Sequence, residues 1–215
     1  MKIPELKKIV HLAAGGNHML ALDQKGNVFA WGSGQQNQLG RRVVERTRFG
    51  ALVPREFGLP KNKIEKIASG AYHSFAIDKA GKVYAWGLNN FCETAVSDGA
   101  GEDNAIIPNP TVVTEFSQYR IKQIVGGAHH SLACTEDGKL LVWGRADASQ
   151  CGVDLDTVPK ESFIYDDNNN PRIIKTPTII PSKSSFRLIT ETANAIQIFR
   201  LIPLPPALIS LLLLT

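Results

Sequence analysis

The chain contains one short sequence pattern three times, at a nearly constant interval. Each copy has a glycine, two variable residues and a histidine, then a Gly-bearing turn and a Trp-Gly pair. The histidines are 55 and 57 residues apart, and the tryptophans keep the same two intervals. A fixed period of this size indicates an array of repeated structural units or a propeller. The residues that mark the copies are, in chain order, Gly15, His18, Trp31, Gly70, His73, Trp86, Gly127, His130 and Trp143.

Each copy has the pattern of a small antiparallel sheet. A β-branched run precedes the Gly-x-x-His, and two apolar runs then flank the Gly-bearing turn, as in a β-hairpin. A further strand, opening on a proline, is predicted after each Trp-Gly, and this gives about four strands per period, as in a propeller blade. We therefore predict an all-β fold for residues 1–181. Its units lie near residues 9–57, 64–113 and 121–180.

Between residues 3 and 181 the repeats resemble those of the regulator of chromosome condensation family. Three finer matches to its founding member lie at residues 32–41, 87–90 and 126–130. The resemblance implies a seven-bladed β-propeller. Because 215 residues are too few for seven such units, we expect a partial propeller of about three to four four-stranded blades, open because the chain is truncated.

The founding member of this family is a nuclear, chromatin-associated guanine-nucleotide exchange factor for the small GTPase Ran. The resemblance therefore implies a fragment of such a factor, which binds and stabilises the nucleotide-free GTPase. Its implied partners are a Ran-type GTPase and, through the complete protein, chromatin (histones and DNA). It implies neither a membrane partner nor a cofactor. The implied location is the nucleus, and an additional cytoplasmic location is left open. The alternative is a β-propeller interaction scaffold without exchange activity.

The resemblance also implies a partner-binding face at the residues just before the repeat histidines. His129 keeps the residue type of the family at this position. Asn17 departs from the acidic residue of the family, which puts an electrostatic role at residue 17 in doubt. A basic cluster at residues 41–48, which includes Arg41 and Arg42, is suited to phosphate or to an acidic protein surface. A solvated loop is the alternative interpretation of this cluster.

The sequence favours a regulator over an enzyme with its own covalent chemistry. The periodic histidines and tryptophans indicate one structural task repeated three times. We find no catalytic carboxylate pair, Ser-His-Asp arrangement or phosphate-binding loop. The three cysteines, Cys92, Cys134 and Cys151, show no metal-ligand spacing, and the lack of a pairing pattern is typical of a reducing compartment.

The repeat pattern stops after residue 181. A fourth repeat would place a histidine at position 196 or 197, but the chain has Ile196 and Gln197 there. We therefore interpret residues 182–215 as a non-repeat tail that is disordered or results from a truncated or mis-spliced gene model. A hydrophobic interaction tail is the alternative. The tail is too short and too rich in proline for a membrane span of about 20 residues.

Overall fold

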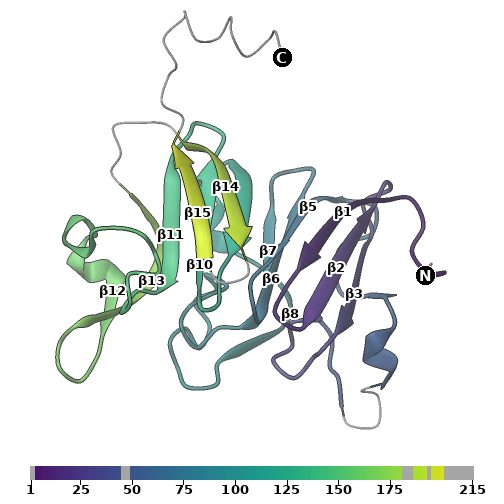
Figure 1. The fold of residues 1–215 in the computed structure, drawn as a ribbon, viewed down its shortest axis with the longest axis horizontal. Helices are drawn as coiled ribbons and strands as arrows, with labels where there is room; N and C mark the ends of the chain where they lie inside the picture. The colour runs from purple at the N-terminus through teal and green to yellow at the C-terminus, as the bar shows by residue number, and fades with distance from the viewer. Residues whose placement is uncertain (1–2, 45–48, 181–185, 193–194, 201–215) are drawn as a thin grey trace, which may run out of the picture.

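The computed structural model describes residues 3–44, 49–180, 186–192 and 195–200, the last two ranges as backbone only. Within these residues the chain forms three antiparallel sheets of four or five strands and one two-stranded sheet (Figure 1). This confirms the predicted all-β, open propeller fold. The first blade contains β1 (Ile9–Ala14), β2 (His18–Asp23), β3 (Val28–Gly32) and β4 (Arg55–Glu56). The second contains β5 (Ile64–Ser69), β6 (His73–Asp78), β7 (Val83–Leu88) and β8 (Ile106–Val112).

The third blade has five strands, one more than the repeat predicts. Its strands are β9 (Ile121–Gly126), β10 (His130–Thr135), β11 (Leu140–Arg145), β12 (Phe163–Tyr165) and β13 (Pro171–Ile179). They are arranged in the order β12-β13-β11-β10-β9. An exposed turn lies at residues 166–170, where the Asp166 carboxylate accepts backbone hydrogen bonds from Asn168 and Asn170. The added strand β12 comes immediately before this turn.

The repeat fixes the register inside each blade. The periodic histidine pairs with the glycine of Trp-Gly in all three: His18 with Gly32, His73 with Gly87 and His130 with Gly144. Gly87 has a φ of +104°, and a Cβ there would lie 2.5 Å from the carbonyl oxygen of Tyr72. Glycine is therefore required where the strand ends against the preceding loop.

β4 starts at Arg55, directly after Pro54, but the corresponding strands of the other two blades begin earlier than the prolines predict. β8 starts at Ile106, so that Pro108 and Pro110 lie inside it, and β13 starts at Pro171 and contains Pro177. β8 is the edge strand of its sheet, where a missing N–H can face away from the ladder. Short 3₁₀ helices occur in the described loops: η2 (Phe49–Leu52), η3 (Thr114–Phe116), η4 (Leu155–Thr157) and η5 (Lys160–Ser162).

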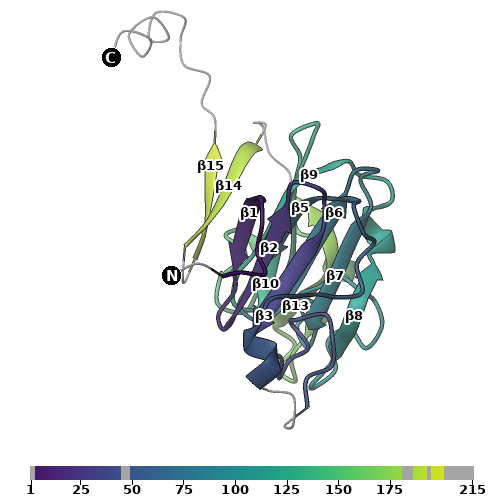
Figure 2. The same ribbon diagram turned by 90° about the vertical axis from the view of Figure 1, so that its right-hand side faces the viewer.

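The blades stack around their first strands (Figure 2). β1 lies beside β5, and β5 beside β9. The loops before the histidines are also joined: Gly16 N–H donates to the Ala71 carbonyl at 3.1 Å, and Ala71 N–H donates to the Gly127 carbonyl at 3.0 Å. The three first strands line an open groove of about 580 Å³. The described part of the chain therefore has the radial arrangement of propeller blades.

Part of the predicted tail forms a two-stranded sheet. β14 (Phe186–Thr192) and β15 (Ala195–Arg200) form an antiparallel hairpin, and β14 lies beside β9 and β10. The strands begin nine residues apart, as β9 and β10 do. The tail boundary at residue 181 stays a prediction, and the remainder of the predicted tail lies outside the described residues.

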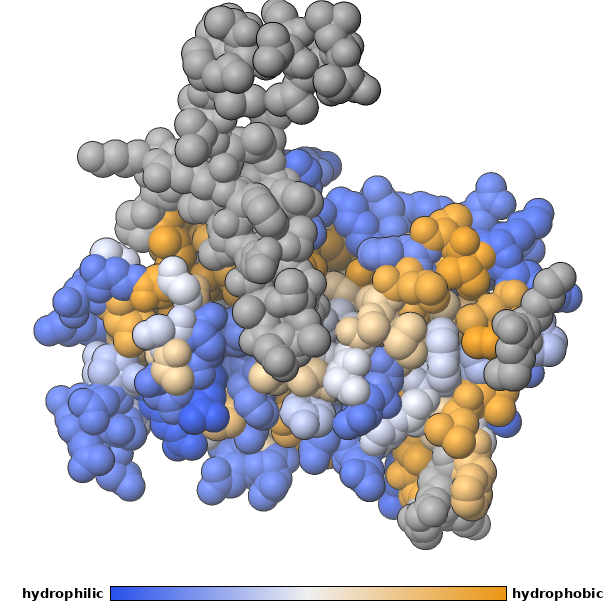
Figure 3. All heavy atoms as spheres, viewed as in Figure 1, coloured by the Kyte–Doolittle hydropathy of each residue, from blue (hydrophilic) through white to orange (hydrophobic). Residues whose placement is uncertain are grey.

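Part of the surface is apolar (Figure 3). Apolar residues appear over the first blade, where Val10 and Leu12 on β1 are 62% and 54% exposed. η2 adds exposed Phe49 and Leu52. No helix in the described residues is both long enough and apolar enough to cross a bilayer.

Candidate protein-interaction face

The periodic residues join each blade to the next by one repeated set of hydrogen bonds. At the first junction, His18 Nε2 lies 2.8 Å from Ser74 Oγ, and Ser74 Oγ donates to the carbonyl oxygen of Gln38. Trp86 Nε1 donates to the same carbonyl at 2.9 Å. The histidine and the loop carbonyl of one blade are therefore tied to the serine and the tryptophan of its neighbour. We call this set the inter-blade lock.

The second junction repeats the lock. His73 Nε2 lies 2.8 Å from Ser131 Oγ, and both Ser131 Oγ and Trp143 Nε1 donate to the carbonyl oxygen of Glu93, at 3.0 and 2.8 Å. Trp86 and Trp143 are completely buried. Glycine in Gly-x-x-His is explained here too, because a Cβ at Gly70 would overlap the imidazole of His73.

The two ends of the stack lack one half of the lock. His130 is buried, yet neither ring nitrogen has a partner among the described residues. Trp31 is only partly buried, since no blade of the described chain lies outside the first. Burial lowers the pKa of His18 and His130 to about 4, and burial with nearby histidines lowers the pKa of His73 to about 3. All three imidazoles are therefore neutral at pH 7 and suited to structural hydrogen bonds rather than charge.

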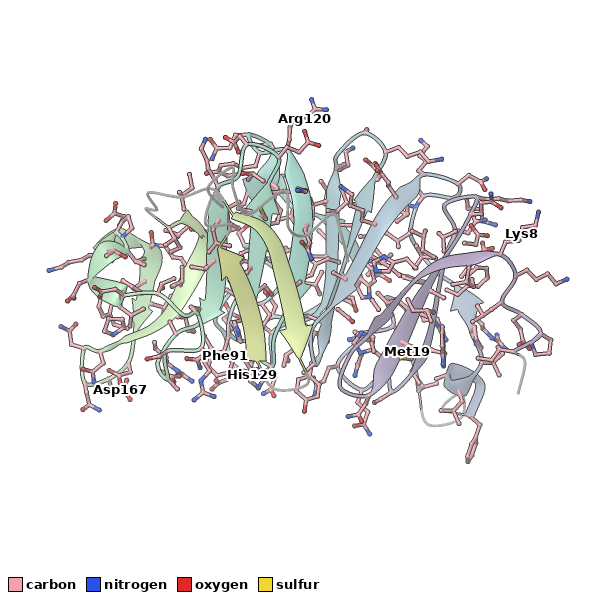
Figure 4. The ribbon with its side chains drawn as sticks, turned by 45° about the horizontal axis from the view of Figure 1, so that its top comes forward. Lys8, Met19, Phe91, Arg120, His129 and Asp167 are labelled. Atoms are coloured by element: carbon pink, nitrogen blue, oxygen red, sulfur yellow. The ribbon has the colours of Figure 1, made fainter. Side chains whose placement is uncertain are left out.

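The residues before the histidines share one edge of the stack with the loops that follow Trp-Gly. Backbone hydrogen bonds join them in every repeat: Ser33 N–H donates to Asn17, Leu88 N–H to Tyr72 and Arg145 N–H to His129. Figure 4 shows Phe91 and His129 side by side at this edge, while Arg120 lies at the opposite one. We call the edge that carries residues 17, 72 and 129 and the loops after Trp-Gly the loop edge.

The most organised part of the loop edge is His129. Its Nδ1 lies 3.0 Å from Glu93 Oε1, and its side chain is 28% exposed, while that of Glu93 is fully buried. Phe91 and Tyr72 flank the imidazole, with ring centroids 5.1 and 5.8 Å away. The imidazole is thus held on one side and open to a partner on the other.

Two arginines extend this site. The guanidinium carbons of Arg145 and Arg172 lie 5.0 and 5.2 Å from the centroid of Phe91, within the range of a cation–π interaction. Arg145 also pairs with Asp147 at 2.7 Å, and this ion pair lowers the pKa of that carboxyl. The loop edge therefore presents a partly exposed histidine among aromatic rings and cations.

The other candidate residues are placed apart from this cluster or serve the fold. Asn17 is exposed on the loop edge of the first blade. Arg41 donates to the carbonyl oxygen of Ala30 at 2.9 Å, which ties its loop to β3, and burial lowers the pKa of its guanidinium. Arg42 is exposed. Residues 45–48, which complete the basic cluster, lie outside the described residues.

The sequence pattern did not point to Phe91, Glu93 or Arg172. A signal for Glu93 was present, because the equivalent loop positions 38 and 150, at the same repeat intervals, both hold glutamine. Phe91 and Arg172 had no such signal, since their meeting depends on β13, which lies outside the repeated motif. No cluster of three or more potential metal ligands occurs in the described ranges, and the three cysteines there are buried.

A sequence model of the RCC1-like domain matches residues 1–196. The chain belongs to the RCC1-like domain family. It is 45% identical over 181 residues to Protein pim1 of Schizosaccharomyces pombe, covering 84% of this chain and 32% of that protein. It is 40% identical over 195 residues to the guanine nucleotide exchange factor SRM1 of Saccharomyces cerevisiae, covering 90% and 40%.

Solved structures agree on this RCC1-like fold. Prp20p from S. cerevisiae superposes with a TM-score of 0.80 at 40% identity, over 88% of this chain and 43% of Prp20p. Human WBSCR16, at 20% identity and a TM-score of 0.69, shares the fold. The chain thus spans less than half the length of these RCC1-like relatives.

Proposed function

We propose that the chain is part of a guanine-nucleotide exchange factor for a Ran-like small GTPase, and that its loop edge contributes to GTPase binding. The observation that carries this proposal is His129. It occupies a position that varies between repeats, with Asn17 and Tyr72 in the other two, on a backbone frame that does not vary. Variable, exposed positions on a repeated frame are where binding specificity is usually encoded.

The relatives support the same function. SRM1 is a guanine nucleotide exchange factor, and Prp20p was studied for its binding to Gsp1p and histones. We extend both partners to the complete protein that contains this chain, and with them a nuclear location. Kap60 bound to yeast RCC1 (Prp20) is a further solved complex of a similar protein.

Exchange in this proposal needs no covalent step. A factor that binds the nucleotide-free GTPase more tightly than the loaded form must weaken nucleotide binding by the same free energy. The loop edge would contribute contacts to the nucleotide-free state through His129 and its aromatic and cationic neighbours. The protein is thus a regulator of the GTPase rather than a catalyst of its own reaction.

The test is release of a fluorescent guanine nucleotide from a Ran-like GTPase, with the 215-residue chain and with a complete propeller that contains it. His129→Ala should slow release by the complete propeller about tenfold or more. Arg120→Ala is the matched control, since this side chain is 85% exposed at the opposite edge. Arg120→Ala should keep the wild-type unfolding midpoint. His129→Ala should lower it, because buried Glu93 loses its partner, so release is compared at a temperature where both variants are fully folded.

Unchanged release by the His129→Ala propeller would remove His129 from the site. A wild-type propeller that binds the GTPase but releases no nucleotide would overturn the exchange function and support an interaction scaffold instead.

A further inference from the structure

The loop between β7 and β8 departs from its counterparts at three equivalent positions. Residues 37, 92 and 149 share a left-handed φ of 55–62°, and residues 40, 95 and 152 share one of 60–63°. The backbone path is therefore the same in all three repeats. The sequence is not: the second loop has Cys92, Glu93 and Ala95 where the others have Asn or Ser, Gln and Gly. Glycine adopts this backbone conformation freely, but alanine does so at a cost.

Glu93 performs the local task of the glutamines and one more. Gln38 Oε1 accepts the backbone N–H of residue 36 at 2.9 Å, and Gln150 Oε1 that of residue 148 at 2.7 Å. Glu93 Oε2 accepts the N–H of Phe91 in the same way, at 2.8 Å. A glutamine would suffice for this bond. The carboxylate therefore adds only its second oxygen, Oε1, and a charge in a fully buried position.

Burying a carboxylate is unfavourable unless it is paired or fully hydrogen-bonded. The partner of Oε1 is His129, which comes from the next blade. We propose that Glu93 is a positioning residue for His129: it fixes the orientation and the tautomer of the imidazole that meets the GTPase. This inference rests on the proposed function, which it deepens by naming the residue that prepares His129 for its partner.

The chemistry of the pair defines which atom His129 offers. An ionised carboxylate only accepts hydrogen bonds, so the imidazole must carry a hydrogen on Nδ1. In the neutral ring, Nε2 is then the acceptor and is the nitrogen left for a partner. Glu93→Gln reverses this arrangement. If the amide oxygen stays on the N–H of Phe91, as in the other loops, the amide NH₂ faces Nδ1 and moves the ring hydrogen to Nε2.

The experiment measures both the tautomer of His129 and the affinity for the GTPase. Nitrogen-15 NMR of histidine-labelled 215-residue protein should show His129 protonated at Nδ1 in the wild type and at Nε2 in Glu93→Gln. The affinity for a nucleotide-free Ran-like GTPase should fall about tenfold in Glu93→Gln, the size expected for one hydrogen bond to a charged group. In the His129→Ala background the same change should have no further effect, because Glu93 acts through His129.

Each outcome decides a separate question. An unchanged tautomer, or an equal loss of affinity with and without His129, would overturn the positioning role. If a complete wild-type propeller that contains this chain binds no GTPase, the proposed function fails, and the tautomer alone decides whether Glu93 sets His129. Ala95→Gly, a change in the same loop that does not touch His129, should leave both the tautomer and the affinity unchanged.

Discussion

The two junctions between blades use the same lock but differ in what surrounds it. In both, a serine hydroxyl and a tryptophan N–H share one backbone carbonyl, that of Gln38 at the first junction and of Glu93 at the second. Because the carbonyl belongs to the backbone, the side chain of the same residue can vary without loss of the lock. The first junction keeps the repeat glutamine. The second replaces it with a glutamate that contacts a partly exposed histidine.

The largest effect should come from the tryptophans, which test whether the junctions are equally strong. Trp86→Ala and Trp143→Ala should each lower the free energy of unfolding by about 3–5 kcal/mol, because both indoles are fully buried. Trp31→Ala should cost clearly less, since this indole is only partly buried. Urea denaturation of the three variants measures the difference. Equal losses at all three positions would contradict this account of the locks.

The next largest loss of stability should come from placing a glutamate, as found at the second junction, at the first junction. Gln38→Glu buries a carboxylate where Tyr72 stands in place of His129, and should cost about 3 kcal/mol. Adding Tyr72→His rebuilds the pair and should recover part of the loss. Urea denaturation of the single and double variants measures the coupling. A Gln38→Glu protein as stable as the wild type would show that the glutamate needs no histidine.

The sequence predicted the blades better than the contacts between them. Glycine and tryptophan spacing determine strand, turn and strand within one repeat, so the hairpins and their register follow from local rules. The partner of His18 is Ser74, in the next repeat, and pairing of this kind depends on which blades face each other. The strand β12 has only three residues, too short for a periodic signal.

The proposed binding edge was predicted only where the resemblance pointed to a position. His129 was proposed in this way, but its contact with Glu93 was not. The pattern of a repeat identifies the structural residues through their constancy, whereas Glu93 matters because it departs from the repeat. A comparison of loop residues at equal offsets would have found it.

The buried histidines give a pH dependence with a defined sign. Burial and nearby histidines lower the pKa of His73 from 6.5 to about 3, so the folded protein keeps it neutral while the unfolded chain takes up a proton below pH 6.5. Its contribution to stability is complete above pH 6.5 and is lost as the pH falls toward 3. Between pH 6.5 and 5 this loss is about 2 kcal/mol for one histidine.

Urea denaturation at pH 7.5 and pH 5 tests this dependence on the wild type and on His73→Ala. The variant should be less stable at pH 7.5 because it loses the bond to Ser131, but its stability should fall less between the two pH values. An identical pH dependence in both proteins would exclude His73 as a titrating group. A His73→Ala protein of unchanged stability would remove it from the lock.

The smallest effect is expected at Ala95, where the two loops have the same backbone and different surroundings. Ala95→Gly removes the strain of a left-handed alanine, which stabilises the fold by about 1–2 kcal/mol. It also gives the unfolded chain more conformational freedom, which destabilises the fold by about 0.5–1 kcal/mol. The loss of a buried methyl group destabilises it by about 0.8 kcal/mol more. These terms nearly cancel, so the stability should stay within about 0.5 kcal/mol of the wild type.

Gly40→Ala is the matched change in the first loop. Its Cβ would lie 2.5 Å from the ring of Phe57 and 3.2 Å from Trp86 Nε1, so it should destabilise clearly where Ala95→Gly does not. If both variants unfolded at the wild-type urea midpoint, the loops would be interchangeable, and Ala95 would no longer mark the second loop as specialised.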